Sequence, residues 1–169
     1  MGARIKYLSD MLKYKKMNRR ESLNLHIRNL FPVLYDYKKS AGSVDDHYFF
    51  MDIYVAKKIL EEAPERHYDV GSRVDGLISH LLCGGQRTTM IDIRPLNIQI
   101  EDLDYIQADA TNMNGIEKNS LKSLSSLHAA EHSGLGRYGD DVDPEACFMF
   151  MKSLQSVLAP GETLFCSTG

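Results

Sequence analysis

Residues 128–132, His-Ala-Ala-Glu-His, place two imidazoles and a carboxylate within one short stretch. In one class of zinc peptidases the pattern H-x-x-E-H supplies two metal ligands and a catalytic glutamate. That chemistry needs a helix, on which residues i and i+4 share a face, and a third protein ligand. The stretch before it predicts a strand, and Gly134 and Gly136 after it interrupt a helix. We therefore expect no metal here, and we regard Glu131 and His132 as candidates for proton transfer.

The composition is that of an ordinary globular domain, since 43% of the 169 residues are apolar and 25% are charged. Cys83, Cys147 and Cys166 are odd in number and form no C-x-x-C pair. This argues against a disulfide framework or a zinc knuckle and favours a cytoplasmic location. We expect neither a signal peptide nor a transmembrane segment, because no apolar run approaches the roughly 18 residues of a membrane span.

Charge is unevenly distributed along the chain. Residues 1–40 carry ten Lys and Arg against three Asp and Glu, and residues 41–169 carry ten against twenty. A basic segment could contact nucleic acid or an anionic membrane. A solvated helix face is the better interpretation, because Ile5, Leu8, Met11 and Leu12 have helical spacing and predict burial. We expect residues 1–45 to form a basic, largely helical extension, without a nucleic-acid partner, ahead of an α/β domain at 46–169.

The α/β domain is predicted from alternating apolar and helix-compatible stretches. Its first helix spans about 47–62, with a stripe of Phe50, Ile53, Tyr54, Lys57 and Leu60. The strands are predicted within 67–72, 88–93, 104–110, 121–129 and 161–167, and further helices within 73–82 and 143–158. Strands that alternate with helices predict a mainly parallel sheet, and ligands of such sheets bind beyond the carboxyl ends of the strands. The segments to inspect are 69–76, 92–94, 109–111 and 128–141.

These segments carry an ordered set of motifs. "DVGS" follows the first strand, Asp92 ends the second, "ADA" follows the third, "EH" follows the fourth, and "LAPGETLF" leads into the fifth. Residues 64–169 thereby resemble class I S-adenosylmethionine-dependent methyltransferases. More narrowly, "DVGSRVDGLISHLL" and "SLSSLHAAEHSGLGRYGDDVDP" look like a methyltransferase-like family catalogued as a domain of unknown function (number 268). The resemblance implies a Rossmann-like sheet of order 3-2-1-4-5 with helices on both faces, and methyl transfer from S-adenosylmethionine to an oxygen or nitrogen of a small acceptor.

The resemblance also implies residues for the cofactor. Asp69 and Gly71, with Ser72 and Arg73, would form the turn beside its methionine part, where a glycine lets the backbone approach. Asp92 would accept hydrogen bonds from the ribose hydroxyls.

The later motifs would complete the site. Asp109 and Ala110 would meet the adenine, and His128 would border the cofactor. Glu131 and His132 would face the methyl group and the acceptor, with an imidazole suited to proton transfer near neutral pH.

Several of these positions allow a second interpretation. The methyltransferase signature is D-x-G-x-G-x-G, but in this sequence Arg73 and Asp75 replace its second and third glycines. A binding module that has lost or changed its cofactor is therefore an alternative. Arg73 could bind a carboxylate or phosphate. Asp92 could instead cap the turn after its strand, and Asp109 could be the N-cap of residues 110–113. For Arg94 a surface ion pair is the better interpretation. The sequence ends after the fifth strand, which allows two expectations: a domain truncated there, or a minimal sheet with the fifth strand at its edge.

The loop "GLGRYGDD", residues 134–141, combines three glycines with groups that bind ligands. Arg137 could clamp an anionic group of the acceptor, and Tyr138 could stack on it or donate a hydrogen bond. The alternative is a simple connector in which Asp143 caps the helix opened by Pro144.

Overall fold

A computed structural model describes residues 2–23, 25, 26, 28, 30–35, 38–41 and 46–168. The chain divides into two compact units, Met1–Val44 and Asp45–Gly169. The domain boundary predicted from the sequence, between residues 45 and 46, directly follows residues 42–45, which lie outside the described part. No helix in the described ranges combines the length and the apolar character that crossing a membrane requires.

The first unit contains helix α1 (Ala3–Met17) and a 3-10 turn, η1 (Glu21–Leu23). None of the residues of α1, all of which are described, is buried. The burial predicted for its apolar positions is therefore wrong, and Ile5, Leu8 and Leu12 are 61%, 53% and 62% exposed. The described part of this unit contains no strand and no second α-helix, so it offers these side chains no core to pack into.

The second unit is built on a five-stranded parallel sheet of order β3-β2-β1-β4-β5. The strands are β1 (His67–Val70), β2 (Thr88–Asp92), β3 (Leu103–Gln107), β4 (Leu121–Leu127) and β5 (Leu158–Ser167). The predicted Rossmann-like fold and its strand order are confirmed. The chain builds outward from β1 through β2 to β3 and then returns to the other side of β1, so strand order reverses between β1 and β4.

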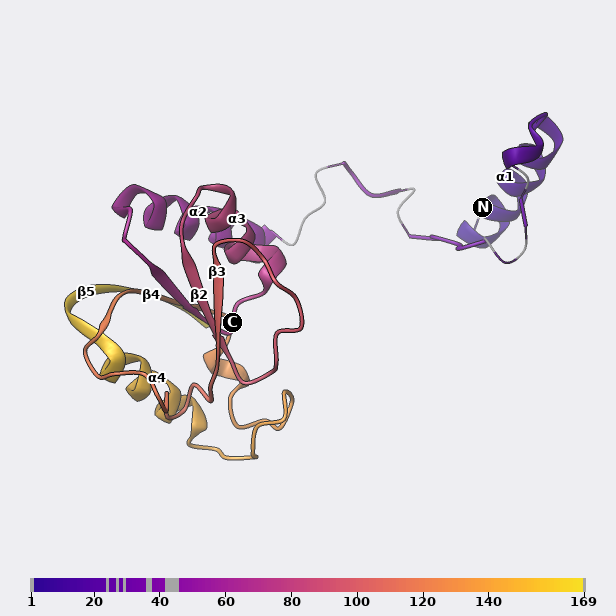
Figure 1. The fold of residues 1–169 in the computed structure, drawn as a ribbon. Helices are drawn as coiled ribbons and strands as arrows, with labels where there is room; N and C mark the ends of the chain where they lie inside the picture. The colour runs from indigo at the N-terminus through magenta and orange to yellow at the C-terminus, as the bar shows by residue number, and fades with distance from the viewer. Residues whose placement is uncertain are drawn as a thin grey trace. The chain divides into compact units, whose positions relative to one another are not determined.

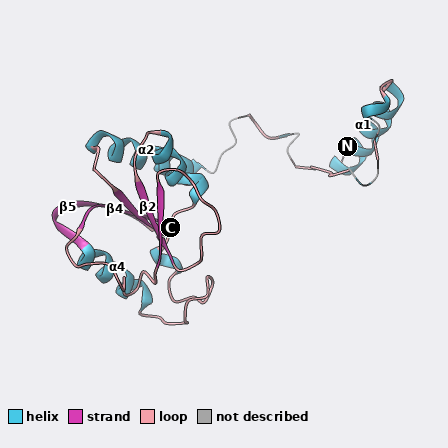
Figure 2. Cartoon of the chain, viewed as in Figure 1, coloured by secondary structure: helices cyan, strands magenta, loops and turns pink. Residues whose placement is uncertain are grey.

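Helices cover both faces of the sheet. Figure 1 shows α2 (Asp46–Glu62) and α3 (Ser79–Cys83) on one side and α4 (Ala146–Val157) on the other, and Figure 2 separates the helices from the strands by colour. A wide helical turn, η4 (Val74–Ile78), leads into α3, and a 3-10 turn, η5 (Ala130–His132), follows β4. On the α4 face, Phe150, Leu154 and Val157 pack against the sheet.

The α2 face corrects the predicted helix stripe. Phe50 and Tyr54 are 60% and 62% exposed, whereas Val55, Ala56 and Ile59 form the buried face of the helix. Both sets have helical spacing, so spacing alone could not choose between them. Compact side chains such as Ala56 let this helix lie close to the sheet.

Candidate functional site

The residues predicted for the site follow the carboxyl ends of neighbouring strands. Asp69 lies in β1, Asp92 ends β2, Asp109 follows β3 and His128 follows β4 directly. In a parallel sheet these ends share one edge, and here that edge includes the point between β1 and β4 where strand order reverses.

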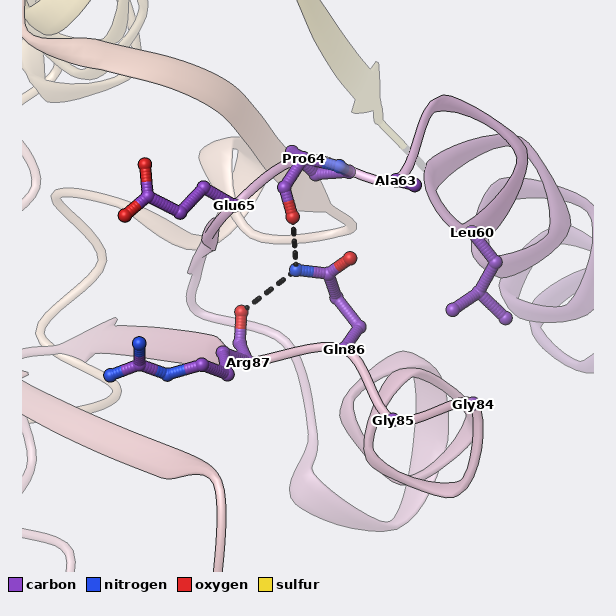
Figure 3. A pocket seen from close by; sticks show the side chains of 8 residues that line it. All are labelled: Leu60, Ala63, Pro64, Glu65, Gly84, Gly85, Gln86 and Arg87. Atoms are coloured by element: carbon purple, nitrogen blue, oxygen red, sulfur yellow. Dashed lines mark hydrogen bonds between the residues drawn. The ribbon is translucent and has the colours of Figure 1, made fainter.

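A hollow of about 300 Å³ lies at the opposite edge, before β1 and β2. Figure 3 shows the Gln86 side chain between two backbone carbonyls, and its Nε2 donates to Pro64 O (2.9 Å) and Arg87 O (3.0 Å). This amide therefore ties two chain segments together, and the hollow is remote from the predicted site.

The Asp69 carboxylate is fully buried and holds the turn after β1. Ser72 N donates to its Oδ1 (3.1 Å), while Ser72 Oγ (2.9 Å) and Ser125 Oγ donate to Oδ2. Burial raises the pKa of Asp69 to about 6, and the hydrogen bonds from the two serines oppose that shift. Asp69 and Ser72 thus shape the turn from inside the protein.

A buried histidine, absent from the sequence predictions, continues this network. His67 Nε2 lies 2.8 Å from Ser125 Oγ, and Nδ1 lies 2.8 Å from Ser123 Oγ. Since the Ser125 hydroxyl donates to Asp69, it accepts from His67 Nε2–H. In a neutral imidazole with this tautomer, Nδ1 accepts from the Ser123 hydroxyl. Burial lowers the pKa of His67 to about 3, which agrees with a neutral ring.

Gly71 and Arg73 take different places in this turn. Gly71 has a φ of +79°, and a Cβ at this position would lie 2.8 Å from Ala129 Cβ. The glycine is therefore needed for contact between the loops that follow β1 and β4. The Arg73 side chain is 80% exposed and pairs with Asp75 through hydrogen bonds of 2.9 and 2.7 Å. Arg73 thus points into solvent.

Asp92 is 6% exposed and is engaged by Arg94. Its Oδ1 accepts from Arg94 N (2.9 Å) and Nε (2.9 Å), and its Oδ2 accepts from Arg94 Nη2 (2.7 Å). The ion pair expected for Arg94 is therefore present, and Asp92 also caps the turn after its strand. The Arg94 side chain remains 47% exposed.

Arg94 connects Asp92 to the loop 134–141. Its guanidinium carbon lies 4.4 Å from the centre of the Tyr138 ring, and that of Arg137 lies 5.0 Å from the same ring. The rings of His132 and Tyr138 meet edge to face at 6.1 Å. Residues predicted separately for cofactor and acceptor thus form one cluster, which we call the Tyr138 cluster: Asp92, Arg94, His132, Arg137 and Tyr138.

Asp140 organises this loop, a role that the sequence did not reveal. Its carboxylate accepts from the backbone N of Gly134 (2.7 Å), Gly136 (3.3 Å) and Tyr138 (3.0 Å). These bonds, chiefly the one from Tyr138, lower the pKa of Asp140. Asp143 Oδ1 accepts from Glu145 N (2.9 Å) just before α4, close to its expected capping role.

Asp109 forms an N-cap, which was one of its two predicted roles. Its Oδ1 accepts from Thr111 N (2.8 Å) and Thr111 Oγ1 (2.7 Å). The carbonyl of Ala110 accepts from Ser153 Oγ of α4. Both residues therefore lie in a turn that is held from within the protein.

His128 and Glu131 form a second group beside the Tyr138 cluster. His128 Nδ1 lies 3.8 Å from Glu131 Oε1. The His128 ring also meets His47 at 5.0 Å and Tyr48 at 4.2 Å, both from α2. The predicted catalytic pair is thus divided, with His132 near Tyr138 and Glu131 near His128. Within the described ranges, His, Cys, Asp and Glu side chains form no group of three or more that could hold a metal.

The chain is similar in fold to solved methyltransferases. No family model and no curated protein matches the sequence, so the narrower resemblance to a domain of unknown function stays a prediction. One similar structure is the complex of the Haloferax volcanii Trm112 methyltransferase activator with a putative methyltransferase (16% identity, TM-score 0.49, 73% of this chain and 53% of that chain). Another is Burkholderia thailandensis 1,6-didemethyltoxoflavin-N1-methyltransferase with bound S-adenosylhomocysteine (15%, 0.48, 68% and 51%). The chain spans about half the length of these structures, and the likeness concerns the fold alone.

Proposed function

We propose that this chain binds S-adenosylmethionine at the carboxyl edge of its sheet and directs methyl transfer to an oxygen or nitrogen of a small acceptor. The observation that carries the proposal is the place of Asp92, a buried carboxylate at the end of β2, next to the reversal of strand order. Ligands of open α/β sheets bind at this place, where an acidic residue accepts from ribose hydroxyls.

The fit of a ribose depends on Arg94. Both Asp92 oxygens already accept from the Arg94 guanidinium, so a ribose must displace it. Arg94 is half exposed and its charge can be hydrated outside the site. The residues therefore fit the cofactor once Arg94 has moved.

The remaining roles follow from position. S-adenosylmethionine, when bound, supplies an electrophilic methyl group on a sulfonium ion. Asp69 and Ser72 hold the backbone turn at Gly71 in the shape that would border its methionine part. Asp109 and Ala110 hold the turn that would border the adenine. These residues position backbone, and Asp92 is the one of them expected to bind through its side chain.

The acceptor side is formed by residues after β4. Glu131 and His132 are the candidate bases, and Arg137 and Tyr138 would contact the acceptor from the loop held by Asp140. Holding the acceptor in line with the methyl group would provide much of the rate.

The second candidate function is binding of an anionic nucleotide without methyl transfer. It is favoured because the carboxylates of Asp69, Asp92 and Asp109 already accept hydrogen bonds from other groups of the protein. It is also favoured by the Arg94 cation at the same edge of the sheet. Arg94 could then bind a phosphate directly.

Thermal shift assays with S-adenosylhomocysteine and with ADP test the two candidates. We expect stabilisation by S-adenosylhomocysteine that grows with its concentration, because a ligand that binds only the folded state raises its stability. Stabilisation by ADP alone would favour the second candidate, and no response to either ligand would refute both.

A further inference from the structure

His128 adopts a backbone conformation that few residues other than glycine adopt. Its φ is +53°, directly after β4. The backbone is held there because His128 N donates to Ser167 O (3.1 Å) at the end of β5. Residues kept in such conformations by their surroundings concentrate at functional sites.

The His128 imidazole is buried. Its side chain is 5% exposed, and neither ring nitrogen has a hydrogen-bond partner among the described residues. A buried polar group without a hydrogen-bond partner destabilises the folded state. His67, by contrast, is buried with both nitrogens bonded to serines. A structural role therefore accounts for His67 but not for His128.

Two rings from the first turn of α2 cover His128. Tyr48 lies 4.2 Å away at a tilt of 55°, and His47 lies 5.0 Å away at 72°. Both residues are themselves exposed, so their side chains can turn outward into solvent. The space beside the imidazole thus already holds a phenol ring, and a ligand ring of the same kind would fit there when Tyr48 turns away.

Two carboxylates, Glu131 and Asp52, and one further imidazole, His47, lie near His128. Glu131 Oε1 lies 3.8 Å from Nδ1, on the chain that follows β4. From α2, Asp52 is close enough for His128 to influence its carboxyl, whose pKa is raised by burial and lowered by His80 and His128. Acidic neighbours stabilise a positively charged imidazole and repel an anionic ligand.

We infer that His128 is the catalytic base of the acceptor site and that the acceptor is a neutral aromatic amine or phenol. This inference rests on the proposed methyl transfer. As the acceptor nitrogen or oxygen forms its bond to the methyl carbon, the sulfur–methyl bond breaks and its electron pair stays on sulfur. The acceptor proton passes to a His128 ring nitrogen, and Glu131 stabilises the resulting imidazolium. His128 thus takes the role of base for which Glu131 and His132 were the candidates, and His132 remains with Tyr138 as an acceptor contact.

The test uses the full chain with isotope-labelled histidine and three probes: aniline, phenol and benzoate. NMR titrations are run with and without S-adenosylhomocysteine. We expect aniline or phenol to move the His128 ring resonances in at least one of the two states, and benzoate to bind more weakly. His128→Asn should weaken binding of that probe by about tenfold, the value of one lost hydrogen bond.

The variants are chosen to remain folded. Asparagine tolerates the left-handed backbone at position 128, and His26→Asn makes the same substitution in the first unit as a matched control. The inference is overturned if no probe moves the His128 resonances in either state, if the probes move only those of His132, or if His128→Asn binds them as tightly as the wild type. Binding of S-adenosylhomocysteine is measured separately, so a failed acceptor site and a failed cofactor site give different results.

Discussion

Replacing Arg94 by methionine should tighten the binding of S-adenosylhomocysteine. Methionine keeps an unbranched apolar chain beside Tyr138 but removes the guanidinium that occupies Asp92 at 2.7 and 2.9 Å. A buried pair of this kind would be worth several kcal/mol, but Arg94 is 47% exposed and its charge is partly screened by solvent. We therefore estimate about 1–2 kcal/mol for its displacement, which corresponds to a roughly 5- to 30-fold gain in affinity.

Isothermal titration calorimetry of the wild type, Arg94→Met and Arg94→Lys measures this effect. Lysine keeps the positive charge but cannot bind both carboxylate oxygens in the same way, so its affinity should lie between the other two. Weaker binding by Arg94→Met would mean that Arg94 itself holds the ligand, as the anionic nucleotide alternative requires. Unchanged affinity would show that the ligand does not use Asp92.

Three further predictions concern the protein around the site. Gly71→Ala should lower the free energy of unfolding by about 1–3 kcal/mol in urea titrations. The added Cβ would clash with Ala129 Cβ, and the φ of +79° at this position disfavours alanine. A loss of less than a few tenths of a kcal/mol would contradict this prediction. Because the pKa of His67 falls from 6.5 to about 3 on folding, the stability that the neutral His67 ring contributes to the wild type should be lost as pH drops from about 6.5 to about 3. The side chain of His67→Gln cannot titrate, so this variant should lack that loss. The pKa of Asp69 is raised to about 6, so Asp69 changes stability in the opposite direction, and it does so in both proteins. Parallel pH–stability curves for the two proteins would refute the assignment of a neutral His67. Asp140→Asn should speed hydrogen exchange at the backbone amides of the loop 134–141, and protection equal to the wild type would show that the carboxylate does not hold the loop.

The sheet could be predicted because its strands are short apolar stretches separated by clear turns and helices. The order 3-2-1-4-5 came from the resemblance in motif order, and the structure confirms it. The stripe of α2 was predicted only in part: Leu60 does pack against the core, but aromatic and aliphatic residues both recur at helical spacing. Only packing shows that Ile59 is buried while Tyr54 is exposed.

The site was less accessible to sequence reasoning, because it depends on pairings between distant segments. Asp92 and Arg94 were each named, yet their spacing of two residues did not reveal that one neutralises the other. His47 lies 81 residues before His128 in the sequence, and only the fold brings its ring into contact with that of His128. His67 and Ser125 meet only because β1 and β4 are neighbours.

The most direct test of the proposed function is a calorimetric titration of S-adenosylhomocysteine into the wild type and Asp92→Asn. Asp104→Asn is the matched control, since it makes the same substitution at an exposed residue of β3. We predict saturable binding by the wild type and the control, and at least about tenfold weaker binding by Asp92→Asn, because an amide accepts the ribose hydroxyls more poorly than a carboxylate. Equal affinity in all three proteins, or no binding by the wild type, would contradict the proposal.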